Sequence, residues 1–275
     1  MKWLPVSFLV LCMLAACRGE APEQAAGNGA GPAPGTPAAV PAEPVVLEDV
    51  IETDRRYIIG ITWPDGIDRY PALAAELKAY ADAARADVMQ AVEALEPDAT
   101  AIYDLALEFK ILLDTPELFA VAADGGSYTG GAHGTPLIAR FVWLPREQRL
   151  LTSSELIPGN GAWQQVSDYV REQLHAALSQ RVDADDLAPE ERLRVIRSAG
   201  RMIEEGTAPE PANFAQFEPV PGRDGRLAAL RFVFPPYQVG PYSDGVQTVE
   251  VPAAVLLPHM AATYRPLFSA APDAQ

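Results

Sequence analysis

Thiol groups are almost missing from this chain of 275 residues, which contains only Cys12 and Cys17. Both lie close to the N-terminus, so the remaining sequence offers no disulfide, no cysteine nucleophile and no cysteine-based metal site. Histidine is nearly as scarce: His133, His175 and His259 lie far apart and lack the spacing of metal ligands. We therefore expect the folded part to use neither a metal ion nor a cofactor.

Basic side chains are also in short supply, because 21 Lys and Arg face 37 Asp and Glu, for a net charge of -16. Nucleic-acid binding needs clustered Lys and Arg to replace counterions, so we expect no nucleic-acid partner. An anionic membrane surface is excluded as a ligand for the same reason, which leaves cationic proteins or neutral ligands. Hydrophobic residues make up 49% of the chain, enough for a globular core.

The N-terminus has the pattern of a secretory signal. Lys2 precedes an apolar run, residues 3–16, that is too short to remain in a bilayer as a spanning helix. The run ends in LAAC, in which small residues precede Cys17, and this string looks like a bacterial lipobox. We expect residues 1–16 to be a lipoprotein signal peptide and Cys17 to carry the lipid; an ordinary secretory signal is the alternative. Removal of Lys2 leaves 20 basic against 37 acidic side chains, a net charge of -17.

The residues after the lipobox indicate where the protein lies. Several acyl chains on Cys17 would anchor it stably, and Arg18 stands where aspartate retains lipoproteins in the inner membrane of enteric bacteria. We therefore expect a cell-envelope lipoprotein in the outer membrane, facing the periplasm. Residues 17–44 are rich in Ala, Pro and Gly with almost no bulky apolar side chain, so they predict a tether of roughly 28 Å.

The remaining sequence predicts an α+β body. Apolar residues at helical spacing indicate helices over 70–95, 162–178 and 189–205. Apolar runs of strand length lie at 45–52, 57–63, 103–113, 118–123, 137–144, 227–234 and 246–251. Turns are expected at 54–55, 64–66, 124–125 and 145–146. Because strands come in runs rather than alternating with helices, we expect a largely antiparallel sheet packed with two to three helices.

The string SYTGGAHG, residues 127–134, is unusually rich in glycine. It misses the G-x-S-x-G nucleophile elbow because Thr129 holds the last position, and nothing in the sequence supplies His133 with a catalytic companion. One interpretation is a tight corner in which His133 bonds loop carbonyls and Tyr128 packs on the sheet. Its structural glycines would be Gly130, Gly131 and Gly134. The other interpretation is a rigid rim that presents Tyr128, Thr129 and His133 to a partner.

A second unusual string is PPYQVGPYSDG, residues 235–245. It predicts either a proline-stiffened connection, whose Tyr237 and Tyr242 cover the end of the sheet, or an aromatic contact surface. Tyrosine suits a contact surface because it offers a large area at little entropic cost.

These strings carry a resemblance to known modules. YTGGAHG at 128–134, after the helix start at Tyr70-Pro71, resembles domain of unknown function 4163. Asn213-Phe214, Phe217 and FVFPPYQVGPYSDG at 232–245 resemble its usual companion, domain of unknown function 3298. The resemblance implies an N-terminal module at 45–150 and a C-terminal module at 151–268, packed together as one body.

This pair of modules occurs in RsiV-type anti-sigma factors, which sense lysozyme by binding it, and ahead of the catalytic domain in certain peptidoglycan deacetylases. We expect neither sigma-factor binding nor deacetylation here, since the sequence has no segment or motif for either. The resemblance implies a lipid-anchored binding protein without its own catalysis, acting on a lysozyme-type muramidase as sensor or inhibitor. A peptidoglycan ligand and an undescribed envelope hydrolase remain alternatives. The candidate binding residues are Tyr128, Thr129, His133, Tyr237 and Tyr242.

Overall fold

The computed structural model describes residues 45–96, 98–159, 161–185 and 187–270. The expected signal peptide, the lipidation site Cys17 and most of the expected tether lie outside these residues, so they remain predictions. No helix in the described part is both long enough and apolar enough to cross a membrane.

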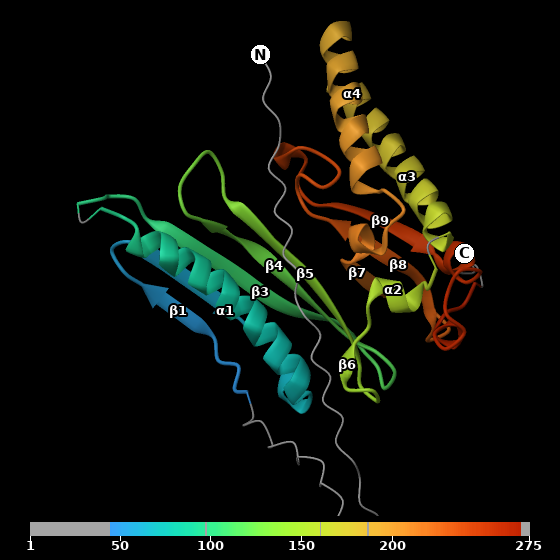
Figure 1. The fold of residues 1–275 in the computed structure, drawn as a ribbon, viewed down its shortest axis with the longest axis horizontal. Coiled ribbons are helices and arrows are strands. Elements are labelled where there is room, and N and C mark those ends of the chain that lie inside the picture. The colour runs from blue at the N-terminus through green and yellow to red at the C-terminus, as the bar shows by residue number, and fades with distance from the viewer. Residues whose placement is uncertain (1–44, 97, 160, 186, 271–275) are drawn as a thin grey trace, which may run out of the picture. The chain divides into compact units, whose positions relative to one another are not determined.

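Six strands form the first sheet, in the order β1-β2-β3-β4-β5-β6 (Figure 1). They are β1 (Val50–Thr53), β2 (Tyr57–Thr62), β3 (Tyr103–Asp114), β4 (Phe119–Tyr128), β5 (Thr135–Leu144) and β6 (Arg149–Leu150). Neighbouring strands are antiparallel except β2 and β3, which are parallel. A parallel pair needs a crossover connection, and the helix α1 (Pro71–Glu93) supplies it.

Helix α1 covers one face of this sheet. Pro71 stands at its first turn, where the missing N–H costs nothing. Its buried residues keep helical spacing and include Leu73, Leu77, Ala81, Ala84, Val88 and Val92. They pack on alternate residues of the strands, such as Ile59, Leu105 and Leu107. The first sheet and α1 therefore share one apolar core.

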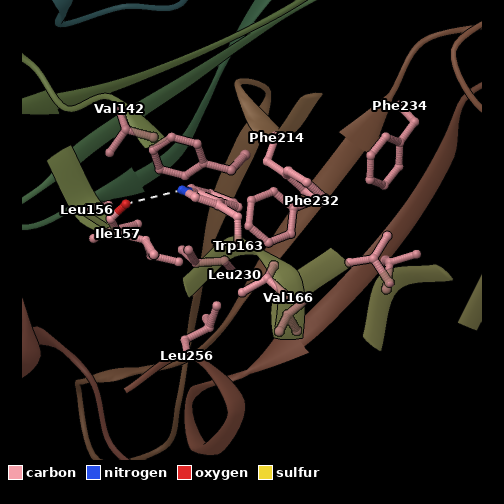
Figure 2. Close-up of a cluster of buried hydrophobic side chains, with 14 of the residues drawn as sticks. Val142, Leu156, Ile157, Trp163, Val166, Phe214, Leu230, Phe232, Phe234 and Leu256 are labelled. Carbon is pink, nitrogen blue, oxygen red and sulfur yellow. Dashed lines mark hydrogen bonds between the residues drawn. The ribbon is translucent and has the colours of Figure 1, made fainter. Parts of the chain in front are cut away.

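The second sheet has three antiparallel strands, β7 (Phe217–Pro221), β8 (Leu227–Phe234) and β9 (Gln247–Pro252). The helices of this half are α2 (Ser153–Leu156), α3 (Ala162–Ala184), α4 (Pro189–Gly206) and α5 (Ala253–Leu256). Figure 2 shows the centre of its core, where Trp163 of α3 stacks on Phe214 and Phe214 meets Phe232 edge-on. The indole N–H of Trp163 donates to the Ile157 carbonyl at 3.1 Å, which satisfies its polar atom inside the core.

The two sheets are joined by a common core and by ion pairs. Ala120 and Val142, on the face of the first sheet opposite α1, belong to the same apolar cluster as Phe217 and Phe232 of the second sheet. Beside this cluster the buried guanidinium of Arg140 in β5 lies between Asp124 and Glu218. The far side of the first sheet is thus covered near β5, whereas exposed Ile51 and Ile58 show that it stays open near β1 and β2.

The α+β prediction with a largely antiparallel arrangement is confirmed. Two local predictions were wrong. Residues 124–125 are not a turn but lie inside β4, where they pair with β3 on one side and β5 on the other. The glycine at 125 serves a close approach to β3, since a Cβ there would lie 2.0 Å from the Ala106 oxygen. The strand expected at 45–52 begins only at Val50. The residues before it contact Trp63 instead, whose indole N–H donates to the Glu48 carbonyl at 3.1 Å.

Candidate functional site

The two strings singled out by the sequence meet in the structure. The Nε2 atom of His133, in the loop between β4 and β5, lies 2.5 Å from the hydroxyl oxygen of Tyr237, in the loop between β8 and β9. The His133 ring also stacks on Tyr242, with centroids 4.1 Å apart and planes 15° apart. The rings of Tyr237 and Tyr242 are themselves 5.9 Å apart. We call these three residues the aromatic cluster.

Each ring nitrogen of His133 has a hydrogen-bond partner in this arrangement. Its Nδ1 lies 2.9 Å from the carbonyl oxygen of Gly134. A carbonyl only accepts, so Nδ1 donates to Gly134, and Nε2 shares the second hydrogen bond with the Tyr237 hydroxyl. Both ring nitrogens are therefore engaged, and the ring holds the two loops together rather than offering a free base.

Tyr237 adopts an unusual backbone conformation, with φ at 74°. Non-glycine residues in this region carry strain of about 1–3 kcal/mol, which the surrounding contacts must offset. The Tyr237 N–H donates to the Gly240 carbonyl at 2.9 Å, closing a tight turn. Nearby, Arg181 of α3 donates to the Asp244 carboxylate at 2.9 Å. The 235–246 loop is thus held in place while 52% of Tyr237 stays exposed.

The glycine-rich loop is closed by its own atoms. Tyr128, the last residue of β4, donates its hydroxyl to the Gly131 carbonyl at 3.1 Å. Gly130 and Gly131 have φ angles of 99° and 96°, which only glycine adopts readily. Gly134, by contrast, keeps an ordinary φ, and a Cβ there would lie 2.9 Å from the Ser127 oxygen. The three glycines expected to be structural are thus required by a positive φ or by a close backbone approach. Thr129 lies exposed in this loop.

A cavity of about 560 Å³ opens beside the aromatic cluster. Its floor is the open face of the first sheet, where Ala106, Gly126 and Pro136 stand side by side on β3, β4 and β5. Tyr128 at the end of β4 and Pro236, Tyr242 and Val246 of the 235–246 loop also line it. The floor is smooth because these three residues have small or compact side chains.

The structure brings four of the five candidate binding residues to one place. His133, Tyr237 and Tyr242 form the cluster, and Tyr128 shares the cavity with Tyr242. Thr129 lines neither. Sequence reasoning missed Asp104 and Ala106 on β3, which face the cavity. The alternation of β3 places both on the same face of that strand, but nothing in the sequence pairs that face with the loops.

The chemistry of this surface is that of contact rather than of a built metal centre. Within the described ranges no group of three or more His, Cys, Asp or Glu is placed to hold a metal ion. The cluster offers ring faces and hydroxyl groups, and the cavity offers apolar walls with the carboxyl group of Asp104 at its edge. His175 and His259 lie elsewhere, bonded to Glu204 and Gln165.

Comparison with known proteins gives a partial match. Residues 156–254 match the family described as "Protein of unknown function (DUF3298)". A search of curated proteins found no match. A DUF3298 family protein from Pseudomonas aeruginosa PAO1 has a solved structure with a TM-score of 0.51 and 16% identity, covering 82% of this chain and 96% of that one. A member of the family from Bacteroides fragilis NCTC 9343 gives 0.49 and 16%, covering 79% and 93%.

The predicted resemblance to domain of unknown function 3298 is therefore confirmed for residues 156–254, a range that includes the whole 235–246 loop. The likeness to the Pseudomonas protein shows a shared fold. The resemblance of the preceding residues to domain of unknown function 4163 stays a prediction.

Proposed function

We propose that this protein is a binding protein of the cell envelope, without catalysis of its own, whose ligand is a lysozyme-type muramidase. The observation that carries the proposal is the contact between His133 and Tyr237, which joins the two strings of the family resemblance into one exposed surface. Folding alone does not require that exposed tyrosines from the 235–246 loop gather beside a histidine of another loop, so the gathering supports a role in binding.

The composition of the surface supports a protein ligand. Tyr237 and Tyr242 are 52% and 37% exposed although they are large aromatic residues, and tyrosine is among the residues that dominate protein interfaces. Their loop is fixed by Arg181 and by the turn at Gly240, so little entropy is lost when a partner binds.

Charge and anchoring support a muramidase as the partner. Lysozyme-type enzymes are basic, and the net charge of -16 over the whole sequence complements them. An outer-membrane lipid anchor on Cys17 would place the body in the periplasm, in the path of an enzyme that attacks the cell wall. Such a protein would act as an inhibitor or as a sensor of the enzyme.

Calorimetry tests the proposal, with lysozyme and with cytochrome c as a basic protein of different shape. Charge attraction alone is screened by salt, since the Debye length falls from about 10 Å at 0.1 M to about 3 Å at 1 M. We expect lysozyme to bind at both about 0.1 M and about 0.5 M salt, and cytochrome c to lose binding at about 0.5 M. Tyr242→Ala should weaken lysozyme binding at least about tenfold, as loss of an aromatic anchor does.

Equal binding of both basic proteins at low salt, with none at high salt, would contradict the proposal. Peptidoglycan would then become the leading ligand, and co-sedimentation of the protein with purified sacculi would test it. Tyr242→Phe, which keeps the ring, and Tyr80→Phe are the paired controls, because Tyr80 lies on α1 and packs against Phe109 and Phe141 on the other face of the sheet.

A further inference from the structure

The cavity beside the aromatic cluster contains one negative charge and no positive charge among its lining residues. Among its lining residues Asp104 is the one carboxylate, and none is Lys or Arg. Asp104 makes no ion pair or side-chain hydrogen bond with any other residue in the described ranges. Neighbouring acids differ in this respect: Asp124 pairs with Arg140 at 2.8 Å and Glu108 pairs with Lys110 at 2.7 Å.

The position of Asp104 follows from the register of the sheet. Asp104 is paired with Ile58 on one side and with Tyr128 on the other, so all three side chains stand on the open face. Ala106 and Gly126, one step along the same face, leave free volume next to the carboxylate. The Asp104 carboxylate therefore lies next to Tyr128, its cross-strand partner, and shares the cavity with Tyr242.

This combination has a chemical complement. A guanidinium or ammonium group is attracted to the face of a tyrosine ring and to a carboxylate, and its alkyl stem packs on apolar walls such as Pro236 and Val246. A neutral apolar side chain would fill the volume but leave the carboxylate of Asp104 partly shielded from water without a partner. An anionic group would be repelled by it.

We infer that the cavity is the receptor for a basic side chain, an arginine or a lysine, of the protein that binds here. The inference rests on the proposed function, because it names the group of the partner that enters the site. The inference gives the negative charge a local use besides long-range attraction, because one carboxylate would bind one cationic side chain in a cavity that two tyrosines line.

The test uses small probes, so that it does not depend on lysozyme. The full-length protein, labelled with ¹⁵N, is titrated with N-acetyl-arginine amide and, separately, with N-acetyl-citrulline amide, which has nearly the same shape but no charge. The amide signals of Ala106 and Gly126 report occupancy of the floor. We expect both signals to shift with the arginine compound and the affinity for the citrulline compound to be at least about fivefold lower.

The variant Asp104→Asn should lower the affinity for the arginine compound at least about fivefold. Asp87→Asn is the matched control, because Asp87 is an exposed carboxylate of α1 on the other face of the sheet and loses the same charge. The Asp87 variant should bind as the unchanged protein does.

Equal affinity for the arginine and citrulline compounds, no shift with either, or an Asp104→Asn variant that binds the arginine compound normally would each overturn the inference. Failure of the inference is distinct from failure of the proposed function. Lysozyme binding that depends on Tyr242 but not on Asp104 would keep the function and reject the basic side chain. Arginine binding without lysozyme binding would do the reverse.

Discussion

Arg140 of β5 and Glu218 of β7 form an ion pair between the two sheets, in which Arg140 Nε donates to Glu218 Oε1 at 2.6 Å. The side chains are only 7% and 10% exposed, so water screens the pair little. The second carboxylate oxygen of Glu218 accepts from Arg231 at 3.1 Å. Each charge in the junction therefore has an opposite charge beside it, which is what a buried ion needs in order to remain ionised.

The first prediction concerns this junction. Glu218→Ala removes one carboxylate from the buried guanidinium of Arg140 and leaves Asp124 as its remaining partner, so we expect the free energy of unfolding to fall by about 1.5–3 kcal/mol. Urea unfolding followed by circular dichroism measures it. Glu250→Ala is the control, since Glu250 pairs with Arg231 at the surface and should cost no more than about 1 kcal/mol. Equal losses for both variants would show that the junction carries no special stability.

The second prediction concerns the glycine-rich loop. Gly130 has φ at 99°, and a Cβ there would make an ordinary contact with the Tyr103 ring, 3.7 Å from its hydroxyl oxygen, so the first cost of a side chain is backbone strain rather than a clash. We expect Gly130→Val to lower the free energy of unfolding by about 1–3 kcal/mol. Ala132→Val, in the same loop but without a positive φ, should change it by less than about 0.5 kcal/mol. A Gly130 variant as stable as the parent protein would mean that the loop relaxes freely.

The third prediction concerns anchoring, which rests on the sequence alone. If LAAC is a lipobox, Cys17→Ser removes the atom that receives the lipid, so the protein should move from the membrane fraction to the soluble periplasmic fraction or accumulate unprocessed. Fractionation and immunoblotting of cells that express either form measure it. A processed Cys17→Ser protein that remains in the membrane would reject the lipoprotein interpretation.

The sequence predicted the helices and the composition of the core better than the arrangement of the strands. In α3 the apolar positions Trp163, Val166, Val170, Leu174 and Leu178 repeat at helical spacing, and all five are buried. Such a pattern is local and needs no partner to be recognised. The parallel pairing of β2 with β3, in contrast, depends on where the chain lies after α1, and no local sequence pattern predicts that position.

In the candidate site, too, local features were predicted and long-range contacts were not. Each loop was recognisable by its own composition, but the contact of His133 with Tyr237 joins residues 104 positions apart. Strand β7 was missed because its five residues include Pro219 and Pro221, which disfavour a strand on propensity alone. Asp104 was missed as well, because an acidic residue in an alternating strand normally faces water and carries no sign of a cavity above it.

The last prediction tests whether His133 and Tyr237 act together. Removal of the His133 ring deletes its stack on Tyr242 and its hydrogen bond to Tyr237, each worth about 0.5–1.5 kcal/mol. We expect His133→Ala to remain folded, with a free energy of unfolding about 1–2 kcal/mol lower. His175→Ala, whose ring lies at the surface beside Glu204, should cost less than about 0.5 kcal/mol.

Tyr237→Phe removes only the hydroxyl that bonds to His133, so it completes a double-mutant cycle. Because both single variants lose the same hydrogen bond, the double variant should be about 0.5–1 kcal/mol more stable than the sum of the two losses implies. Lysozyme affinity measured on the same four proteins then separates two roles for His133. If the ring acts only by holding the loops in place, affinity falls with both His133→Ala and Tyr237→Phe, because each removes the hydrogen bond between the loops. If the ring itself contacts lysozyme, affinity falls with His133→Ala and is largely kept in Tyr237→Phe. An additive cycle would show that the two loops meet without supporting each other, and the surface they form would lose its physical basis as a rigid binding site.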